Sequence, residues 1–324
     1  MRARVGLRFP GCVALCCLSA SAHAQNWPQK PIRLIVPNAP GGSTDLVART
    51  TANKLAESLG QQVVIDNRAG SGGVIGTELV ARSAPDGYTL LMGTIGNLAI
   101  SPHLYPNLTY DPLRDFAPVA QIASAAYMLV VHPSVPARSV KELVALAKAR
   151  PGHLAYASAG SGTGSHLAAE LFRAVAGIDV THVPYKGGTP GLTDVISGQV
   201  QLMFNGIPSS LSHIKSGRIR PLAVTTAKRA AVAPEVPTIG EAGYAGAEST
   251  SWTGLLAPAG TARAIVERLN AELRKAVQAP EVRARLAADG AEPVGSSPEA
   301  FAAYIKAELA KWGRVVKASG AKAD

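Results

Sequence analysis

Short apolar runs alternate with helical patterns of apolar and polar positions along the first part of the chain. The run Ile32–Val36 is rich in β-branched and apolar residues, which predicts a buried strand, and the helical pattern after it ends at Gly60, a residue that favours a helix C-terminus. In this part we expect strands at 32–36, 62–66 and 88–92 and helices at 45–59 and 73–83. A β-α-β-α-β order predicts a parallel sheet covered by helices.

The same alternation then begins again. Ser139 and Glu142 predict a capping box at a helix start, and Thr189 followed by Pro190 predicts another helix start. We expect strands at 154–157, 180–184, 200–204 and 220–225, and a helix at 164–176. Two βαβαβ units predict an α/β protein of two lobes, each a helix-covered and mostly parallel sheet.

The last part of the chain has a different pattern. Three amphipathic helices without strands between them are expected at 261–277, 280–288 and 298–318, and we expect them to pack back onto the first lobe. The apolar, extended segments 121–131 and 249–256 lie between the lobes, so we interpret them as a two-strand hinge. This organisation assigns residues 25–125 and 251–324 to lobe 1 and residues 126–250 to lobe 2.

Five predicted strands end in turns rich in glycine and hydroxyl residues, and each turn opens a helix. The turns lie at 37–45, 67–73, 158–166, 185–190 and 205–210. A helix N-terminus presents unpaired N–H groups and about half a positive charge, and glycine lets a ligand approach the backbone closely. Several such turns facing one cleft predict a site for a small anion. Almost none of their residues suits acid–base or nucleophilic chemistry, which favours a receptor for a carboxylate over an enzyme.

The N-terminus has the pattern of a secretory signal. A basic segment precedes an apolar stretch at 11–20 and the sequence Ala22-His23-Ala24, which predicts cleavage after Ala24 and a signal peptide at 1–24. The apolar stretch is shorter than the roughly 20 residues that span a bilayer, which argues against the alternative of an uncleaved anchor. We therefore expect an exported protein, and a soluble one because no later segment is apolar enough to span a membrane. The cysteines all lie within this segment, at Cys12, Cys16 and Cys17, so the mature chain would have neither a disulfide nor a thiol nucleophile.

Charge and motifs exclude several other functions. The net charge is +10, but the basic residues are spread along helices rather than gathered in a patch, so we expect no nucleic-acid partner. The histidines are scattered, and we expect no metal. A dinucleotide loop fails because Ile75 replaces its third glycine, and a nucleophile elbow at Ser161 fails because Ala159 replaces its first. We expect no cofactor.

Motifs along the whole mature chain carry a family resemblance. In chain order they are Trp27-Pro28-x-Lys30-Pro31-Ile32, Val36-Pro37-x-x-Pro40-Gly41-Gly42-x-x-Asp45, Asn67-Arg68-x-Gly70-x-Gly72-Gly73, Asp86-Gly87-Tyr88-Thr89-Leu90, Tyr110-Asp111-Pro112, Ser158-x-Gly160-x-Gly162-x-x-x-His166-Leu167, Val183-Pro184-Tyr185-Lys186-Gly187 and Glu235-Val236-Pro237-Thr238. With these motifs the chain resembles the substrate-binding proteins of tripartite tricarboxylate transporters, the Bug-type receptors.

The resemblance implies a periplasmic-binding-protein-like clamshell of type II that closes on a small organic carboxylate and delivers it to membrane transporter subunits. We expect it to act as a monomer. Carried over residue by residue, the implied ligand contacts are Pro40, Gly41, Gly42, Asp45, Gly70, Ser71 and Gly72 in lobe 1 and Ser158, Gly162, Thr163, His166 and Tyr185 in lobe 2. Asn205, at the end of its strand, is a further candidate on position alone.

Several alternatives stay open from the sequence. Asp45 either accepts from the ligand or a bridging water, or is a first-turn helix acid; His166 either donates to the ligand or supports its loop. Lys186 either pairs with a distal carboxylate or is simply exposed. Asn38 stands where the family usually has an aromatic residue, which favours a ligand with a polar distal group. The alternative functions are a sensor that presents its closed form to a membrane signalling protein such as a sensor kinase and, less favoured, an exported enzyme acting on a carboxylate.

Overall fold

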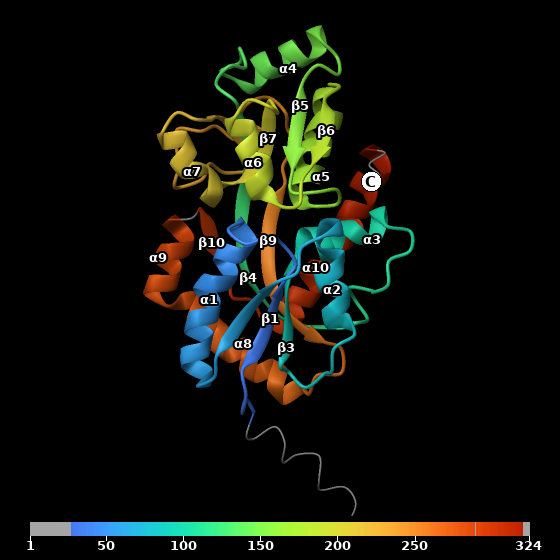
Figure 1. The fold of residues 1–324 in the computed structure, drawn as a ribbon, viewed down its shortest axis with the longest axis vertical. Coiled ribbons are helices and arrows are strands. Elements are labelled where there is room, and N and C mark those ends of the chain that lie inside the picture. The colour runs from blue at the N-terminus through green and yellow to red at the C-terminus, as the bar shows by residue number, and fades with distance from the viewer. Residues whose placement is uncertain (1–26, 289, 320–324) are drawn as a thin grey trace, which may run out of the picture.

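The computed structural model describes residues 27–288 and 290–319, so the predicted signal peptide lies outside the described residues. Two lobes lie one above the other and are joined by two long strands (Figure 1). The strands are β1 (Ile32–Val36), β2 (Val63–Asn67), β3 (Thr89–Thr94), β4 (Phe116–Val131), β5 (Ala155–Ser158), β6 (Thr181–Pro184), β7 (Leu202–Gly206), β8 (Arg220–Val224), β9 (Thr250–Pro258) and β10 (Ala291–Pro293).

Helices cover both faces of the strands. They are α1 (Ser43–Leu59), α2 (Val74–Ala81), α3 (Ser101–Leu104), α4 (Val140–Ala149), α5 (Gly164–Ala176), α6 (Gly188–Ile196), α7 (Ile207–Lys215), α8 (Arg263–Gln278), α9 (Pro280–Ala288) and α10 (Pro298–Ser319), with a 3₁₀ turn η1 (Ser71–Gly73) and a π-helical segment η2 (Gly96–Ile100). Within the described part of the chain, no helix combines the length and apolar character that crossing a membrane requires.

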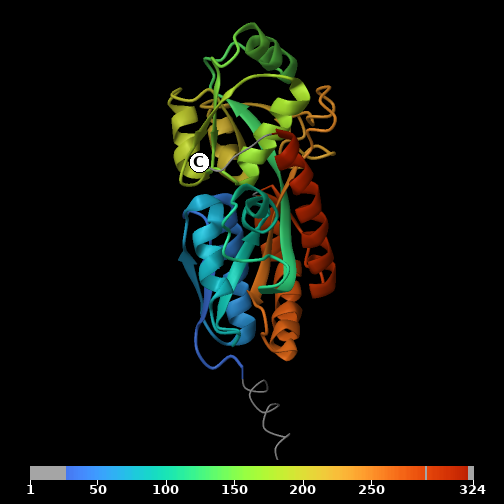
Figure 2. The ribbon, with the colours of Figure 1, turned by 90° about the vertical axis from the view of Figure 1, so that its right-hand side faces the viewer.

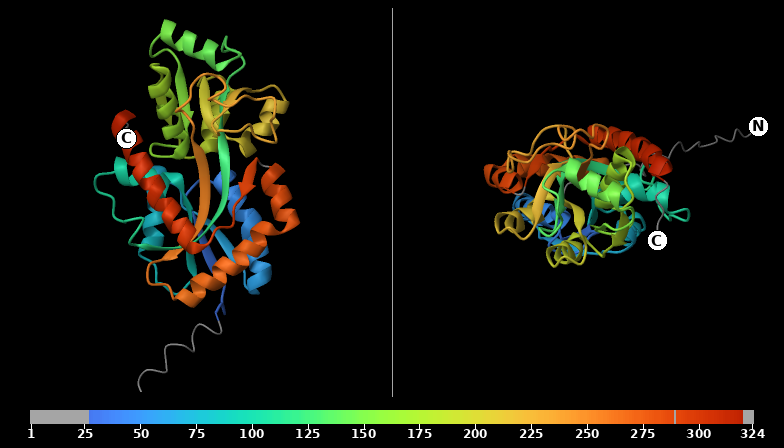
Figure 3. Two further views of the ribbon diagram at one scale, coloured as in Figure 1. Left: turned by 180° about the vertical axis from the view of Figure 1, so that it is seen from behind. Right: turned by 90° about the horizontal axis from the view of Figure 1, so that it is seen from above.

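The sheet runs through both lobes in the order β2-β1-β3-β9-β4-β7-β5-β6, and β8 and β10 also pair with β4. The strands β1, β2 and β3 are parallel in one lobe, and β5, β6 and β7 are parallel in the other. Strand β4 pairs with β9 along its first part and with β7 and β8 along its last five residues. Seen from the side and from behind, β4 and β9 are the strands that pass from one lobe to the other (Figures 2 and 3).

Alternation along the strands builds a core on each face of the sheet. In β1, Ile32 and Leu34 pack with helices α1 and α8, whereas Ile35 packs on the opposite face with α10. In the second half of β4, Leu129 packs with α4 and α5, whereas Met128 packs with α6 and α7. One long strand therefore belongs to the core of both lobes.

The structure confirms most of the predicted elements. Strand β1, helix α5 and helix α9 begin and end at the predicted residues, and Gly60 ends α1 in a left-handed conformation with its N–H bonded to the Ala56 carbonyl. The expected hinge segment 121–131 lies within β4, and the segment 249–256 lies within β9 except for its first residue. The apolar segment that forms η2 and α3 was not predicted.

Two local predictions were wrong, and the predicted capping box holds with a different partner for Glu142. Helix α6 begins at Gly188 after a Gly187 N-cap, so Thr189 lies inside its first turn rather than at the cap. Ser139 caps α4 as predicted, with its Oγ 3.2 Å from the Glu142 N–H, but Glu142 reaches back to the Arg138 N–H. The helical last part also contains β10, which is too short for a sequence pattern and pairs with β4 at Ala123–Ala125.

Candidate functional site

A pocket of about 90 Å³ lies between the two lobes, where the N-termini of four helices meet. The residues contributed by the starts of α1, α5, α6 and α7 are Gly42, Ser43, Thr44, Thr163, Gly164, Ser165, Gly188, Gly206 and Ser209. Strands and other turns complete the wall with Asn38, Ala39, Gly72, Thr94, Ile95, Gly96, Ala125, Tyr127, Ala159, Asn205 and Ser251. Among these lining residues there is no charged side chain.

The four helix starts at the pocket share one property with most helices of the described chain, which is the lack of a side-chain cap. The N-cap residues Gly42, Thr163, Gly187 and Gly206 make no side-chain capping bond to a backbone N–H of the first turn of their helices. Uncapped N-termini leave backbone N–H groups available, and each contributes about half a positive charge. The pocket is therefore electropositive through its backbone alone, which suits a small anion.

Tyr127 places a phenol in this pocket from the middle of β4, where the two lobes join. Burial raises the pKa of Tyr127 to about 12, so the hydroxyl keeps its proton and can donate at neutral pH. The sequence motifs do not point to this residue, although a tyrosine inside an apolar hinge segment was a usable signal. The other hydroxyl residues that these motifs missed are Ser43, Thr44, Thr94, Ser165, Ser209 and Ser251.

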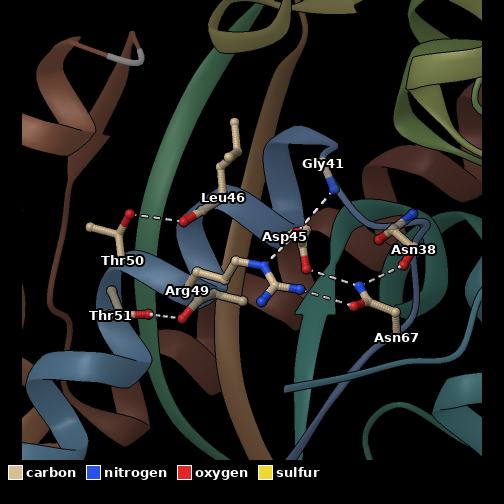
Figure 4. A network of polar contacts seen from close by, with 9 residues as sticks. Asn38, Gly41, Asp45, Leu46, Arg49, Thr50, Thr51 and Asn67 are labelled. Atoms are coloured by element: carbon tan, nitrogen blue, oxygen red, sulfur yellow. Dashed lines mark hydrogen bonds and ion pairs between the residues drawn. The ribbon is translucent and has the colours of Figure 1, made fainter. Parts of the chain in front are cut away.

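Asp45 is the last residue of the lobe 1 turn 38–45, and both of its carboxylate oxygens accept hydrogen bonds from other protein groups (Figure 4). Oδ2 accepts from the Gly41 N–H at 2.9 Å and from Arg49 Nε at 2.8 Å, and Oδ1 accepts from Asn67 Nδ2 at 3.0 Å. Asn67 also donates to the Asn38 carbonyl, at 3.0 Å. The carboxylate holds the turn 38–45 in place and is not among the groups that line the pocket.

The environment of Asp45 also fixes its charge. Burial alone raises the pKa of this carboxyl, but hydrogen bonds from Arg49, Gly41 and Asn67 outweigh burial and hold the pKa below its ordinary value. Asp45 is therefore ionised at neutral pH. Its negative charge is neutralised on its own side of the turn and does not oppose an anion in the pocket.

Histidines hold the corresponding turn of the other lobe. His166 is buried in α5, and its Nδ1 accepts from the Gly162 N–H at 3.1 Å. Ser158 is also fully buried, with its Oγ 2.7 Å from His182 Nε2 and 3.1 Å from the Gly160 N–H. Neither His166 nor Ser158 lines the pocket; both support the loop that does.

The remaining candidates of this lobe occupy different places. Thr163 lines the pocket and ties its own turn by donating from Oγ1 to the Gly160 carbonyl at 2.7 Å. Asn205 lines it too, with Nδ2 bonded to Ser209 and Ser210 at 2.9 Å each. Tyr185 instead donates its hydroxyl to Asp194 Oδ2 at 2.6 Å, away from this pocket.

A second cavity of about 240 Å³ lies on the other side of Gly72 and Thr163, which line both. It is lined by Gly70, Ser71, Tyr185 and the exposed Lys186, among others. The predicted contacts thus separate into three groups: Gly42, Gly72, Thr163 and Asn205 line the first pocket; Gly70, Ser71 and Tyr185 line only the second; and Pro40, Gly41, Asp45, Ser158, Gly162 and His166 line neither.

The two lobes are in contact around the first pocket. A Cβ on Gly187 would lie 2.7 Å from the Ala39 Cβ, and a Cβ on Gly72 would lie 2.6 Å from the Ser161 carbonyl oxygen. The Tyr105 hydroxyl also donates to that carbonyl at 3.4 Å. Only glycine allows the backbones of the two lobes to approach this closely, so these turns are built for a closed clamshell.

A clamshell with two hinge strands and an electropositive pocket between its lobes defines a class, the two-lobed solute-binding receptors. Residues 47–321 match the family model described as "Tripartite tricarboxylate transporter family receptor". The chain belongs to this family of periplasmic transport receptors, for which a binding role rather than an enzymatic one is characteristic.

Individual relatives are similar along nearly the whole chain. Protein BugT of Bordetella pertussis is 40% identical over 311 residues, which cover 96% of this chain and 95% of BugT. Two solved structures from Rhodopseudomonas palustris are similar to this chain over their whole length. Rpa4515 with adipate is 41% identical, covers 92% of this chain and has a TM-score of 0.89; MatC with bound malate is 34% identical, covers 90% and has a TM-score of 0.86.

Proposed function

We propose that this protein captures a small organic carboxylate and delivers it to the membrane subunits of a tripartite tricarboxylate-type transporter. The observation that carries the proposal is the meeting of four uncapped helix N-termini on one pocket whose lining residues include no charged side chain. The solved relatives with adipate and malate support a carboxylate, and the family supports a transporter as partner.

The size of the pocket favours a compact acid. A single water needs about 10–15 Å³ of such volume, so about 90 Å³ accommodates roughly six to nine non-hydrogen atoms. Short dicarboxylates fall near this range, whereas nucleotides and sugar phosphates of larger size do not. Asn38, which lines both cavities, supplies an amide for a polar distal group.

Binding then follows from the geometry of the lobes. We propose lobe 1 at 25–125 and 251–324 and lobe 2 at 126–250, with the ligand docking first on the start of α1. Closure about β4 and β9 adds the starts of α5, α6 and α7, and the ligand favours the closed state because it contacts both lobes. Micromolar affinity needs about −8 kcal/mol, and charge-assisted hydrogen bonds worth about 1.5–3 kcal/mol each supply much of it.

The site residues divide by role in this proposal. Gly42, Gly72, Thr163 and Asn205 contact the ligand, together with the hydroxyl of Tyr127. Asp45, Ser158 and His166 position the turns instead, because their polar groups are bonded to backbone N–H groups of those turns. A ligand carboxylate thus meets backbone and neutral side chains only.

We also propose that the protein acts as a monomer and without catalysis. Ser158 and His182 form a serine–histidine contact of 2.7 Å, but the Ser158 side chain is fully buried and its Oγ also accepts from the Gly160 N–H. A nucleophile must reach its substrate, and this hydroxyl does not line either cavity.

A thermal-shift screen of the chain from residue 25 onward tests the proposal. The probes are malate, adipate and other short dicarboxylates, each compared with its neutral diamide. A ligand at 100 times its Kd adds about 2.7 kcal/mol to the free energy of unfolding, which raises Tm by roughly 5–10 °C. We expect at least one acid to raise Tm and its diamide to leave Tm unchanged. Equal shifts by acid and diamide would contradict the anion site, as would no shift from any acid once mass spectrometry shows the purified protein to be empty.

A further inference from the structure

Three aromatic rings stack behind the lobe 2 turn. His166 of α5 and His182 of β6 lie face to face, with ring centroids 4.1 Å apart and planes 10° apart. Tyr156 of β5 stacks on His182 at 4.8 Å and 18°. None of the three lines the pocket, although the turn that they support contributes Thr163 and Gly164 to it.

Each histidine is bonded to this turn, which spans residues 158–163. The Gly162 N–H donates to His166 Nδ1 at 3.1 Å. His182 Nε2 lies 2.7 Å from Ser158 Oγ, and the same hydroxyl accepts from the Gly160 N–H at 3.1 Å. Two backbone N–H groups of one turn are thus satisfied through the imidazoles, one directly and one through a serine.

The first of these bonds fixes the protonation state of His166. A backbone N–H can only donate, so Nδ1 must offer a lone pair, and the imidazole is neutral. Protonation would place a hydrogen on Nδ1 and leave two donors facing each other across 3.1 Å. A second positive charge on His182, stacked at 4.1 Å, would add like-charge repulsion.

One ionisable group bonded to the stack is Glu170 of α5. Glu170 accepts from the Tyr156 hydroxyl at 2.6 Å and pairs with Arg173 at 2.7 Å, so its charge is already compensated on α5. The packed segment η2 contributes Gly96–Ile100, which include no ionisable side chain. Helix α10 contributes the apolar contacts of Trp312 and Val316 to the cluster that contains Leu167 of α5.

We propose that His166 and His182 are positioning residues that hold the 158–163 turn in its binding form only while His166 is neutral, so that the receptor releases its carboxylate in acid. The release of a carboxylate rests on the proposed function, whereas the dependence of the turn on a neutral His166 does not. The bond from the Gly162 N–H is intact while His166 is neutral, so affinity is complete at neutral and higher pH and falls once the pH is low enough to protonate the imidazole.

Amide exchange in the absence of any ligand tests the geometry. We expect the protection factor of the Gly162 amide, corrected for intrinsic exchange, to fall by about tenfold between pH 8 and pH 5.5. His166→Asn offers an acceptor oxygen near the position of Nδ1 and does not titrate, so its protection should be constant with pH. His166→Phe retains the ring stack but has no acceptor, so its protection should be low at both pH values. Protection of wild-type Gly162 that does not change with pH would overturn the proposal.

Calorimetry with adipate tests the consequence. We expect the wild-type Kd to rise by about tenfold between pH 8 and pH 5.5 and the Kd of His166→Asn to rise much less. His182→Gln, which keeps a polar group near the position of Nε2, should reduce the pH dependence while retaining affinity at pH 8. Titration of adipate itself weakens all variants alike, so an equal rise in wild type and His166→Asn would refute the role of His166. If adipate binds at neither pH, the choice of ligand fails, and the exchange measurement still decides this proposal.

Discussion

Two turns on opposite sides of the pocket each bring a helix start to it, but side chains of different chemistry hold them in place. The lobe 1 turn, 38–45, and the lobe 2 turn, 158–163, each bring a glycine-rich helix start to the pocket. A buried carboxylate holds the first through the Gly41 N–H, and a neutral imidazole holds the second through the Gly162 N–H. In both, a side chain four residues along the chain accepts from a backbone glycine. The motif is therefore a way to shape a turn, and the identity of the acceptor decides when the turn loosens.

The two acceptors titrate in different pH ranges. Because hydrogen bonds from Arg49, Gly41 and Asn67 outweigh the effect of burial, the pKa of Asp45 is lower in the folded protein than in the unfolded chain. Its contribution to the free energy of unfolding is therefore complete above about pH 4 and is lost only as the pH falls below that value. The lobe 2 turn depends on a neutral imidazole instead, and loses its bond when that imidazole accepts a proton. Mild acid should loosen one side of the pocket only.

The largest expected effect comes from adding a methyl group at a helix start of lobe 2. In Gly164→Ala the new Cβ would lie 2.0 Å from the Tyr127 hydroxyl oxygen and 2.7 Å from Ile95 Cγ2. Overpacking costs about 1–3 kcal/mol even where neighbours yield, and here the neighbours line the pocket. We expect the affinity for an acid found in the screen to fall by about 10–100-fold, measured by calorimetry.

Gly42→Ala is the matched control on the lobe 1 side. Gly42 also lines the pocket at a helix start, but its Cβ would meet only the Ala39 carbonyl, at 3.6 Å, which is ordinary contact. We expect a smaller loss of affinity than in Gly164→Ala, because the added methyl can disturb a contact with the ligand but does not clash with the protein. Gly164→Ala combined with Tyr127→Phe should have a higher Tm than Gly164→Ala alone, because the nearest clashing atom is removed, but should not regain affinity, because the hydroxyl proposed to contact the ligand is lost with it. Equal losses in Gly42→Ala and Gly164→Ala would contradict the geometry of the pocket.

The next largest effect is a difference between the two turns in how the protection of their glycine amides depends on pH. Between pH 8 and pH 5.5 we expect protection of the Gly162 amide to fall by about tenfold while protection of the Gly41 amide stays constant. The reason is that Asp45 remains ionised throughout this range. Both amides are measured in one exchange experiment, so each is the reference for the other. Parallel loss at the two glycines would indicate general loosening of the protein rather than titration of one turn.

Asp45→Asn breaks the lobe 1 turn at any pH. The amide cannot accept from Gly41, Arg49 and Asn67 together, so a buried donor loses its partner at a cost of about 1–3 kcal/mol. We expect a lower Tm and a loss of affinity of about 3–10-fold.

Asp115→Asn is a close control for that variant. Asp115 also accepts from a backbone N–H four residues earlier, that of Asp111, at 2.7 Å, and pairs with Arg114 at 2.7 Å, yet it lines neither cavity. We expect it to lower Tm and leave affinity unchanged. If both variants weaken binding equally, the Asp45 network has no particular role in shaping the site.

The sequence predicted the fold closely because the fold depends on local patterns. Strand β1 and helix α5 have the predicted bounds, and the hinge segments have the apolar composition of strands buried on both faces. The elements that were not predicted are very short or depend on contacts between residues far apart in the sequence. The three residues of β10 pair with β4, far away in the sequence, and no periodicity marks a strand of that length.

The site was predicted in position rather than in detail. Motif spacing located the glycine turns, but it could not tell a group that lines the pocket from one that holds the turn in place. His166 and Asp45 were both open between these roles, and their bonds to Gly162 and Gly41 support the second role for each. Tyr127 was missed because its place in the pocket depends on how the two lobes close, which is a tertiary property.

The smallest expected effect concerns Tyr185, whose hydroxyl donates to Asp194 at 2.6 Å instead of facing the first pocket. Burial and the nearby Asp194 carboxylate raise the pKa of Tyr185 to about 12, so this bond persists across the physiological range. Tyr185→Phe removes one hydrogen bond at a cost of about 1 kcal/mol in the free energy of unfolding. We expect the affinity to change by less than about twofold, because the ring remains in place beside Gly191. A loss of tenfold or more would place the hydroxyl in the site and would extend the ligand into the second cavity.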